Sequence, residues 1–247
     1  MAVELRKDFI RVARDWKDYG EKKISKSGAS IVVIDTEDPL YDIITKSLPA
    51  KLTSLNEKKS FNESLLSKGS PGEGVKNLAP WIATFHLRET SSAKKGFYPV
   101  YLFSGDLTNL YLSIALGVTD FEGYFGKGKK SLNAIRSAAL KKRTISKELL
   151  EKNLNDRLLN ELISSSIDVA RSNRNFLHKA YGEGSIFSLE YNLENLPSNE
   201  ILLEDYDQML NLYESMVTDV ASPDVEELAV NEVIKEEKKE VTVTNFV

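Results

Sequence analysis

PWIATFHL at residues 80–87, FYPVYLF at 97–103 and LYLSIAL at 110–116 are the stretches that decide the fold. Each is short and rich in aromatic and β-branched residues, which is typical of β-strands. The polar connector RETSSAKKG at 88–96 separates the first two, and a shorter turn with glycine and aspartate separates the last two. The pattern predicts a β meander at the centre of the chain.

Alternation along 97–103 divides its side chains between two faces of the predicted sheet. One face carries Phe97, Tyr101 and Phe103, and the other carries Tyr98, Val100 and Leu102. At least one face must be core, and the other is open to a different use. Pro99 within this strand predicts a sheet edge or a bulge, because proline cannot donate to the ladder.

The rest of the chain alternates between helical and extended patterns. We expect helices over 3–19, 131–143, 146–172 and 202–220, short helices interrupted at Pro49 over 40–67, and strands over 31–34 and 185–193. The glycine-rich KGSPGEG at 68–74 predicts a loop. The fold class is therefore α/β (α+β): a curved, mostly antiparallel mixed sheet flanked by helices. Residues 1–221 are expected to form a single domain, followed by an acidic flexible tail or linker at 222–247.

Composition excludes several classes of protein. The chain has 247 residues, no cysteine and two histidines. Disulfides, thiolate zinc sites, cysteine nucleophiles and histidine-rich metal centres are therefore excluded. No apolar run approaches the roughly 18 residues of a membrane span, and the first residues lack the apolar core of a signal peptide. We expect a cytoplasmic protein that binds neither metal nor cofactor.

The net charge of −4 conceals an asymmetry. Residues 190–221 contain eight acidic residues and no basic one, and 222–247 contain seven acidic residues and three lysines, so residues 1–189 carry +8. Between 127 and 147 lie eight basic residues and no acidic one. Such density suits phosphate contacts, whose affinity comes from counterion release. A solvated helix face is the alternative interpretation.

Two patterns that would indicate an enzyme are incomplete. Residues 123–129, GYFGKGK, resemble the start of a phosphate-binding P-loop, but Lys130 replaces the Ser or Thr that binds magnesium. Asp42 with the Glu-Lys-Lys at 57–59 matches a nuclease pattern only loosely. We therefore expect a binding module without catalytic activity of its own.

The central block, residues 72–120, resembles the N-terminal domain of McrB-type restriction proteins. The resemblance rests on the Gly-x-Gly at 72–74, the Pro-Trp-Ile-Ala at 80–83 and the Gly-Phe-Tyr-Pro-Val at 96–100, with apolar strands after them. The later Lys-Ala-Tyr-Gly at 179–182 fits more weakly. McrB-type proteins are the DNA-reading, GTP-driven subunits of restriction systems that depend on modified cytosine.

The resemblance implies a DNA reader that flips a 5-methyl- or 5-hydroxymethylcytosine out of the duplex into a pocket. The matching pocket positions are Trp81, Tyr98, Leu102 and Tyr181, with Trp81 and Tyr181 as the stacking candidates. The basic residues expected to contact the DNA backbone are Lys94, Lys95, Lys127, Lys129, Lys130, Arg136, Lys141, Lys142 and Arg143. The basic helices lie in extra sequence before the 179–182 segment, so their role is inferred from charge alone.

Full McrB-type proteins continue into an AAA+ GTPase, for which this chain has no credible nucleotide-binding motif. The expected partners are double-stranded DNA with modified cytosine and an AAA+ GTPase motor and nuclease subunit on other domains or chains, within a phage-defence system. Two alternatives remain open. One is a nucleic-acid binder indifferent to modification, and the other is a protein-interaction subunit that uses its acidic C-terminal helix and tail.

Overall fold

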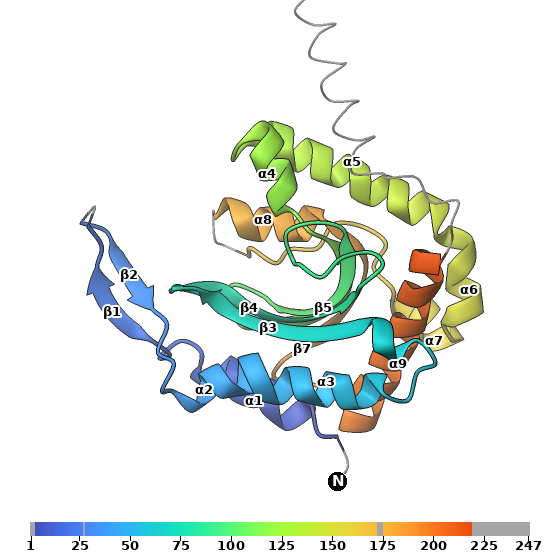
Figure 1. The fold of residues 1–247 in the computed structure, drawn as a ribbon, viewed down its shortest axis with the longest axis horizontal. Coiled ribbons are helices and arrows are strands. Elements are labelled where there is room, and N and C mark those ends of the chain that lie inside the picture. The colour runs from blue at the N-terminus through green and yellow to red at the C-terminus, as the bar shows by residue number, and fades with distance from the viewer. Residues whose placement is uncertain (1–2, 27, 172–174, 219–247) are drawn as a thin grey trace, which may run out of the picture.

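A curved sheet of antiparallel strands lies between two groups of helices in the computed structural model (Figure 1), which describes residues 3–26, 28–171 and 175–218. Its strands are β1 (Glu21–Ile24), β2 (Ser30–Val33), β3 (Leu65–Glu73), β4 (Val75–His86), β5 (Phe97–Phe103), β6 (Asn109–Leu116) and β7 (Ser185–Asn192). The body of the sheet has the order β3-β4-β5-β6-β7. The β1–β2 hairpin joins it through one pair, Val33 opposite Val75. Every pair among the described strands is antiparallel, and the predicted fold class is confirmed.

Helices cover both faces of this sheet. They are α1 (Arg6–Asp15), α2 (Pro39–Asp42), α3 (Leu48–Asn56), α4 (Thr119–Phe125), α5 (Lys129–Ile145), α6 (Leu150–Asn153), α7 (Asp156–Glu161), α8 (Phe176–Glu183) and α9 (Asn199–Thr218). A π-helical turn (Ile43–Ser47) links α2 to α3, and 3₁₀ turns precede β3 (Asn62–Ser64) and α6 (Lys147–Leu149). In Figure 1, α1 to α3 lie under the convex face, whereas α4, α5 and α8 lie over the concave face.

The predicted meander is β4, β5 and β6, and β7 continues it on the far side of β6. Pro99 lies on β5, which pairs with a strand on each side and so is not an edge strand over its whole length. The ladder between β4 and β5 ends at Val100, and Pro99 lies just beyond it. Proline lacks a backbone N–H, but at this position no residue of β4 is paired with it, so no hydrogen bond of that ladder is lost.

The segment 68–74 is strand up to Glu73, with only Gly74 in a turn, so the prediction of a loop across the segment was wrong. It forms most of β3, with a register shift between Ser70 and Gly72. Gly69 allows the strand to lie against the π-helical turn between α2 and α3, because a Cβ there would be 1.9 Å from the Ile44 carbonyl oxygen. Gly72 adopts a positive φ of 128° at the bulge. The glycines and proline serve a bulge and a close approach inside a strand.

The predicted helix over 146–172 was also wrong as one element. Leu154 adopts an extended conformation after α6, and α7 ends at Leu162, which is extended too. Asn155 starts α7 by accepting a hydrogen bond from the Leu158 N–H, as asparagine at an N-cap commonly does. Ile163 then pairs with Ser188 of β7 in an isolated bridge. Local capping therefore overrides the leucine periodicity.

The convex face is the packed side of the sheet. The apolar stripe of α1 is buried as the spacing predicts, with Phe9 fully buried against Tyr101 and Phe103 of β5. Helix α9 adds Tyr206 and Tyr213 to the same layer. Among the described residues no helix is long and apolar enough to cross a membrane. The predicted tail at 222–247 lies outside the described residues.

Candidate nucleic-acid interface

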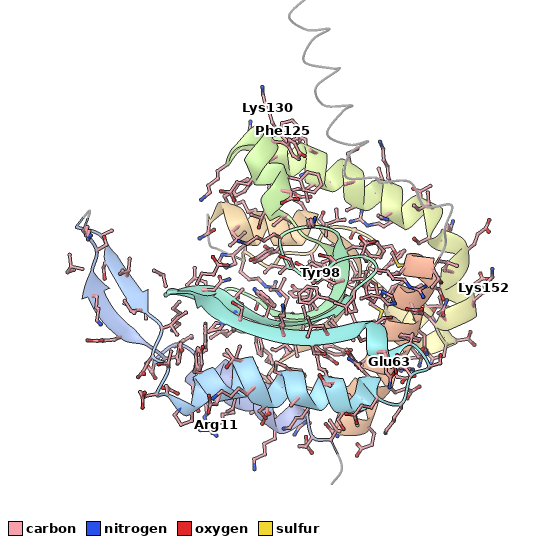
Figure 2. The ribbon with its side chains drawn as sticks, viewed as in Figure 1. Arg11, Glu63, Tyr98, Phe125, Lys130 and Lys152 are labelled. Atoms are coloured by element: carbon pink, nitrogen blue, oxygen red, sulfur yellow. The ribbon has the colours of Figure 1, made fainter. Side chains whose placement is uncertain are left out.

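A small cavity of about 20 Å³ lies on the concave side, between the centre of the sheet and α8. It is lined by Trp81, Ala93, Tyr98, Val100, Leu102, Ala115, Leu116 and Tyr181. All four residues proposed for the base pocket from the sequence therefore line one cavity. Tyr98, labelled near the centre of Figure 2, lies between the sheet and the helices over its concave face.

Strand register explains how the β-strands deliver these side chains. Trp81 of β4 lies opposite Leu102 of β5, and Tyr98 lies opposite Ala115 of β6. Because side chains alternate along a strand, Tyr98 and Leu102 share the cavity face with Val100. The small side chain of Ala115 leaves room beside Tyr98. The floor of the cavity thus follows from ordinary antiparallel pairing.

The connector 88–96 forms a roof over this floor. The Tyr98 hydroxyl donates a hydrogen bond to the Ala93 carbonyl at 2.8 Å. Burial raises the pKa of Tyr98, so this hydroxyl stays protonated and a donor. The Lys68 ammonium holds the Ser91 carbonyl at 3.3 Å on one side of the roof, and the Asp120 N–H holds the Lys94 carbonyl on the other. The roof is a folded structure anchored on both flanks.

Tyr181 lines the cavity from helix α8. It lies one turn after His178 on that helix, with ring centroids 6.2 Å apart. His178 Nε2 lies 2.9 Å from Asn77 Oδ1, and the Asn77 side chain also hydrogen-bonds the Tyr181 hydroxyl. Burial raises the pKa of Tyr181 to about 12 and lowers the pKa of His178. A neutral, hydrogen-bonded group thus fixes the tyrosine from behind.

The cavity is too small for a nucleobase in this structure. A volume of about 20 Å³ accommodates roughly one water molecule, whereas small-molecule sites measure roughly 300–1,000 Å³. A nucleobase enters only if a wall moves. The roof is the irregular wall of the cavity, and the Tyr98 hydroxyl joins its middle to the floor through the Ala93 carbonyl.

Five of the predicted backbone-contacting lysines are exposed. Lys94 and Lys95 lie on the roof, and Lys127, Lys129 and Lys130 lie at the turn between α4 and α5. Lys127 forms an ion pair with Glu122 at 3.1 Å. Figure 2 shows Lys130 at the outer surface, on the same side of the sheet as Tyr98.

Other basic residues of α5 contact the protein itself. Lys142 is only 5% exposed, and its ammonium lies 4.3 Å from the centroid of the Phe97 ring. Arg143 donates to the Ile186 carbonyl at 2.9 Å, and burial lowers its pKa. Arg136 forms a two-pronged ion pair with Glu183, with N–O distances of 2.6 and 2.8 Å. Some of the basic side chains at 127–147 therefore join α5 to β7 and α8. Lys141 is half-buried.

The enzyme-like patterns do not form sites in the part of the chain that the structure describes. The P-loop-like segment 123–129 begins inside helix α4 rather than after a strand, and Gly126 ends that helix. Asp42 pairs with Lys46, whereas Lys59 pairs with Asp207 of α9. No group of three histidine or acidic side chains that could hold a metal occurs among the described residues.

A family model described as MrcB-like, N-terminal domain matches residues 21–218. The chain belongs to this family. A comparison with curated proteins gave no match. As an MrcB-like N-terminal domain, the chain is a DNA-binding module of McrB-type restriction systems. The match begins at β1 and ends at the last residue of α9, so it covers the whole sheet.

The structure of this MrcB-like domain adds lining residues that the motifs did not name. Strand alternation already placed Val100 beside Tyr98, and Ala115 follows from register once the β5–β6 turn is known. Ala93 and Asn77 carried no signal in the sequence. Each is placed by an irregular segment: the roof, or the stretch of β4 between Lys76 and Trp81 where the described pairing with β3 is interrupted.

Proposed function

We propose that this domain recognises a modified cytosine, 5-methyl or 5-hydroxymethyl, that is flipped out of duplex DNA into the cavity of Trp81, Tyr98, Leu102 and Tyr181. The observation that carries the proposal is the convergence of these four side chains on one hollow. They come from three separate elements: β4, β5 and α8.

The chemistry of the walls suits a planar, partly apolar ligand. Two aromatic rings on different elements can stack on a base, and stacking contributes about 1–3 kcal/mol per base. Leu102 and Val100 supply apolar surface for a methyl group. The hydroxyls of Tyr98 and Tyr181 remain protonated, because burial raises the pKa of both. These contacts offset the few kcal/mol needed to unpair and unstack the base.

The exposed lysines supply the sequence-independent part of the affinity. Lys94 and Lys95 lie on the roof itself, so a duplex that presents a base to the cavity brings its phosphates close to them. The cluster at Lys127, Lys129 and Lys130 follows α4, which contacts the roof through Asp120. Phosphate contacts position the duplex, and the cavity reads the base. Catalysis is assigned to an AAA+ GTPase motor and a nuclease on other domains or chains, in the cytoplasm.

Fluorescence anisotropy tests the proposal. Duplexes that differ in one cytosine (unmodified, 5-methyl or 5-hydroxymethyl) are titrated at fixed salt with wild type, Trp81→Ala and Tyr181→Ala. Loss of one stacking partner, at about 1–3 kcal/mol, predicts a five- to 150-fold weaker binding of the preferred modified duplex. Binding of the unmodified duplex is expected to change little.

Leu87→Ala is the matched control. Leu87 directly follows β4, the strand that carries Trp81, but its side chain is 53% exposed and does not line the cavity. It should retain the modified-base preference. Equal binding of all three duplexes by a folded wild-type protein would overturn base recognition and favour a nucleic-acid binder indifferent to modification. A modified-base preference that survives both substitutions would place the reading site elsewhere.

A further inference from the structure

The β1–β2 hairpin, residues 21–33, is an arm that extends away from the body of the domain (Figure 1). It is attached to the main sheet through the single pair Val33–Val75. Every residue of β1 is exposed, and the side chain of Ile24 is 73% exposed. A two-stranded hairpin is marginally stable alone, and this one adds little to the core. Its presence therefore points to a role at the surface.

The base of the arm is fixed in direction. Gly20 adopts a φ of 88°, and a Cβ there would lie 2.6 Å from the Val33 carbonyl oxygen, so only glycine fits this close approach. The Tyr19 hydroxyl donates to the Asp35 carbonyl at 2.9 Å. The Ile34 N–H donates to the Gly74 carbonyl at 3.2 Å. These contacts join the two ends of the hairpin to each other and to the β3–β4 turn.

The same turn leads directly to the cavity. Gly74 contacts the arm, and Asn77, three residues further along β4, hydrogen-bonds the Tyr181 side chain. Figure 1 shows the arm and the β3–β4 turn at the same end of the sheet, which is also the end over which α8 lies. A duplex that presents a base to Tyr181 therefore extends past the arm.

The arm carries a net positive charge. It carries Lys22, Lys23 and Lys26 against the single acidic residue Glu21. Lys23 lies 2.7 Å from Glu21 on one face, and Lys22 lies on the other face with Ile24, because side chains alternate along β1. The major groove of B-DNA, about 12 Å wide, admits a two-stranded ribbon of this kind.

We propose that the arm contacts the phosphates of the duplex beside the flipped base and so extends the DNA interface beyond the cavity. This inference rests on the proposed function for the position of the duplex, but it concerns affinity rather than base recognition. The arm has three lysines and one glutamate, so its charge favours a polyanion such as DNA over an acidic protein surface. Phosphate binding depends on the density of positive charge more than on a complementary shape.

The test is a salt titration of Lys22→Ala/Lys23→Ala/Lys26→Ala on modified and unmodified duplexes. Each lost phosphate contact lowers the slope of log affinity against log salt by about 0.9. We expect a slope reduced by about two to three and a roughly tenfold or greater loss of affinity near 0.1 M salt. The loss should be equal for both duplexes, so the modified-base preference is retained.

Lys7→Ala/Lys58→Ala/Lys152→Ala is the matched control, with the same change in net charge. These lysines are exposed, and Figure 2 shows Lys152 at the end of the molecule opposite the arm. The control should keep the wild-type slope, and both variants should keep the wild-type melting temperature because the substituted side chains are exposed.

An unchanged slope in the arm variant, or an equal loss in the control, would overturn the arm proposal. A wild-type protein that binds both duplexes equally, with the arm variant still weakened, would overturn modified-base recognition and leave the arm supported. Failure of the wild type to bind either duplex would overturn both, and would favour a protein partner for the arm.

Discussion

The two faces of β5 have similar composition and different packing. On the convex face, Tyr101 lies 4.7 Å from Phe9 and 6.0 Å from Tyr206, measured between ring centroids. On the concave face, Tyr98 and Leu102 line a cavity. Residues on both faces are nearly inaccessible to solvent. Burial alone therefore does not separate core from candidate site.

The covering elements make the difference. Helices α1 and α9 present aromatic side chains to the convex face, so aromatic rings pack directly against one another there. The concave face is covered by the roof and α8, which meet the floor partly through polar contacts such as the hydroxyl of Tyr98. A face held by few directional bonds can open, whereas interlocked rings cannot move without loss of packing.

The largest predicted effect is a loss of stability when the packing of the convex face is disrupted. Tyr101→Ala should lower the free energy of unfolding by about 3–5 kcal/mol, as for other large buried aromatic side chains, since it also loses the bond from its hydroxyl to the Leu202 carbonyl. Trp81→Ala on the concave face should lower it by about 1–2 kcal/mol, because Trp81 is only partly buried and loses less packing than Tyr101. Urea denaturation of both variants measures the difference. Equal losses would mean that the concave face is core as well.

A smaller effect should appear when the roof is released. Tyr98→Phe removes the donor to the Ala93 carbonyl and should lower the free energy of unfolding by about 1 kcal/mol. Amide hydrogen exchange in the roof, residues 88–96, should become faster. Tyr101→Phe is the matched control, because its hydroxyl also donates to a backbone carbonyl, that of Leu202 at 3.3 Å. Faster exchange of the roof in the control alone would contradict this account.

The sequence predicted the floor of the cavity better than its walls. Alternation along 97–103 separated Tyr98 and Leu102 from Tyr101, because side-chain direction in a strand has a fixed period. The meander, α1 and α9 followed from the same kind of pattern. Periodicity is a local property, so it was sufficient wherever the element was regular.

Irregular segments defeated the same reasoning. Gly72 and its neighbours signal a turn, but here they form a bulge in β3 that only tertiary contact explains. The basic run in α5 suggested DNA contacts throughout, yet the ammonium of Lys142 lies over an aromatic ring of the core. A one-dimensional charge count does not show which side of a helix faces the protein. Lys142 and Lys129 differ in that respect alone.

The smallest predicted effect concerns the pH dependence of stability at two histidines, His86 on the convex side of the sheet and His178 on the concave side. His86 and His178 are both 1% exposed, and burial lowers the pKa of each. A folded-state pKa below the unfolded value of about 6.5 means that the unfolded chain binds the proton more tightly. Each histidine therefore contributes stability that is present above pH 6.5 and is lost as the pH falls through the folded-state pKa.

The two histidines should differ in how steeply that stability is lost. His86 has Glu214 at 3.1 Å, and this carboxylate opposes the effect of burial on its pKa. His178 has burial alone as the cause of its lowered pKa, and its Nδ1 is buried without a hydrogen-bond partner. Protonation there would create a buried donor with nothing to accept it. Urea denaturation from pH 7 to pH 5 should therefore show a shallower acid decline for His178→Gln than for His86→Gln. The reverse order would mean that the concave side tolerates charge better than the convex side, and that the wall behind Tyr181 is more open to solvent than its burial indicates.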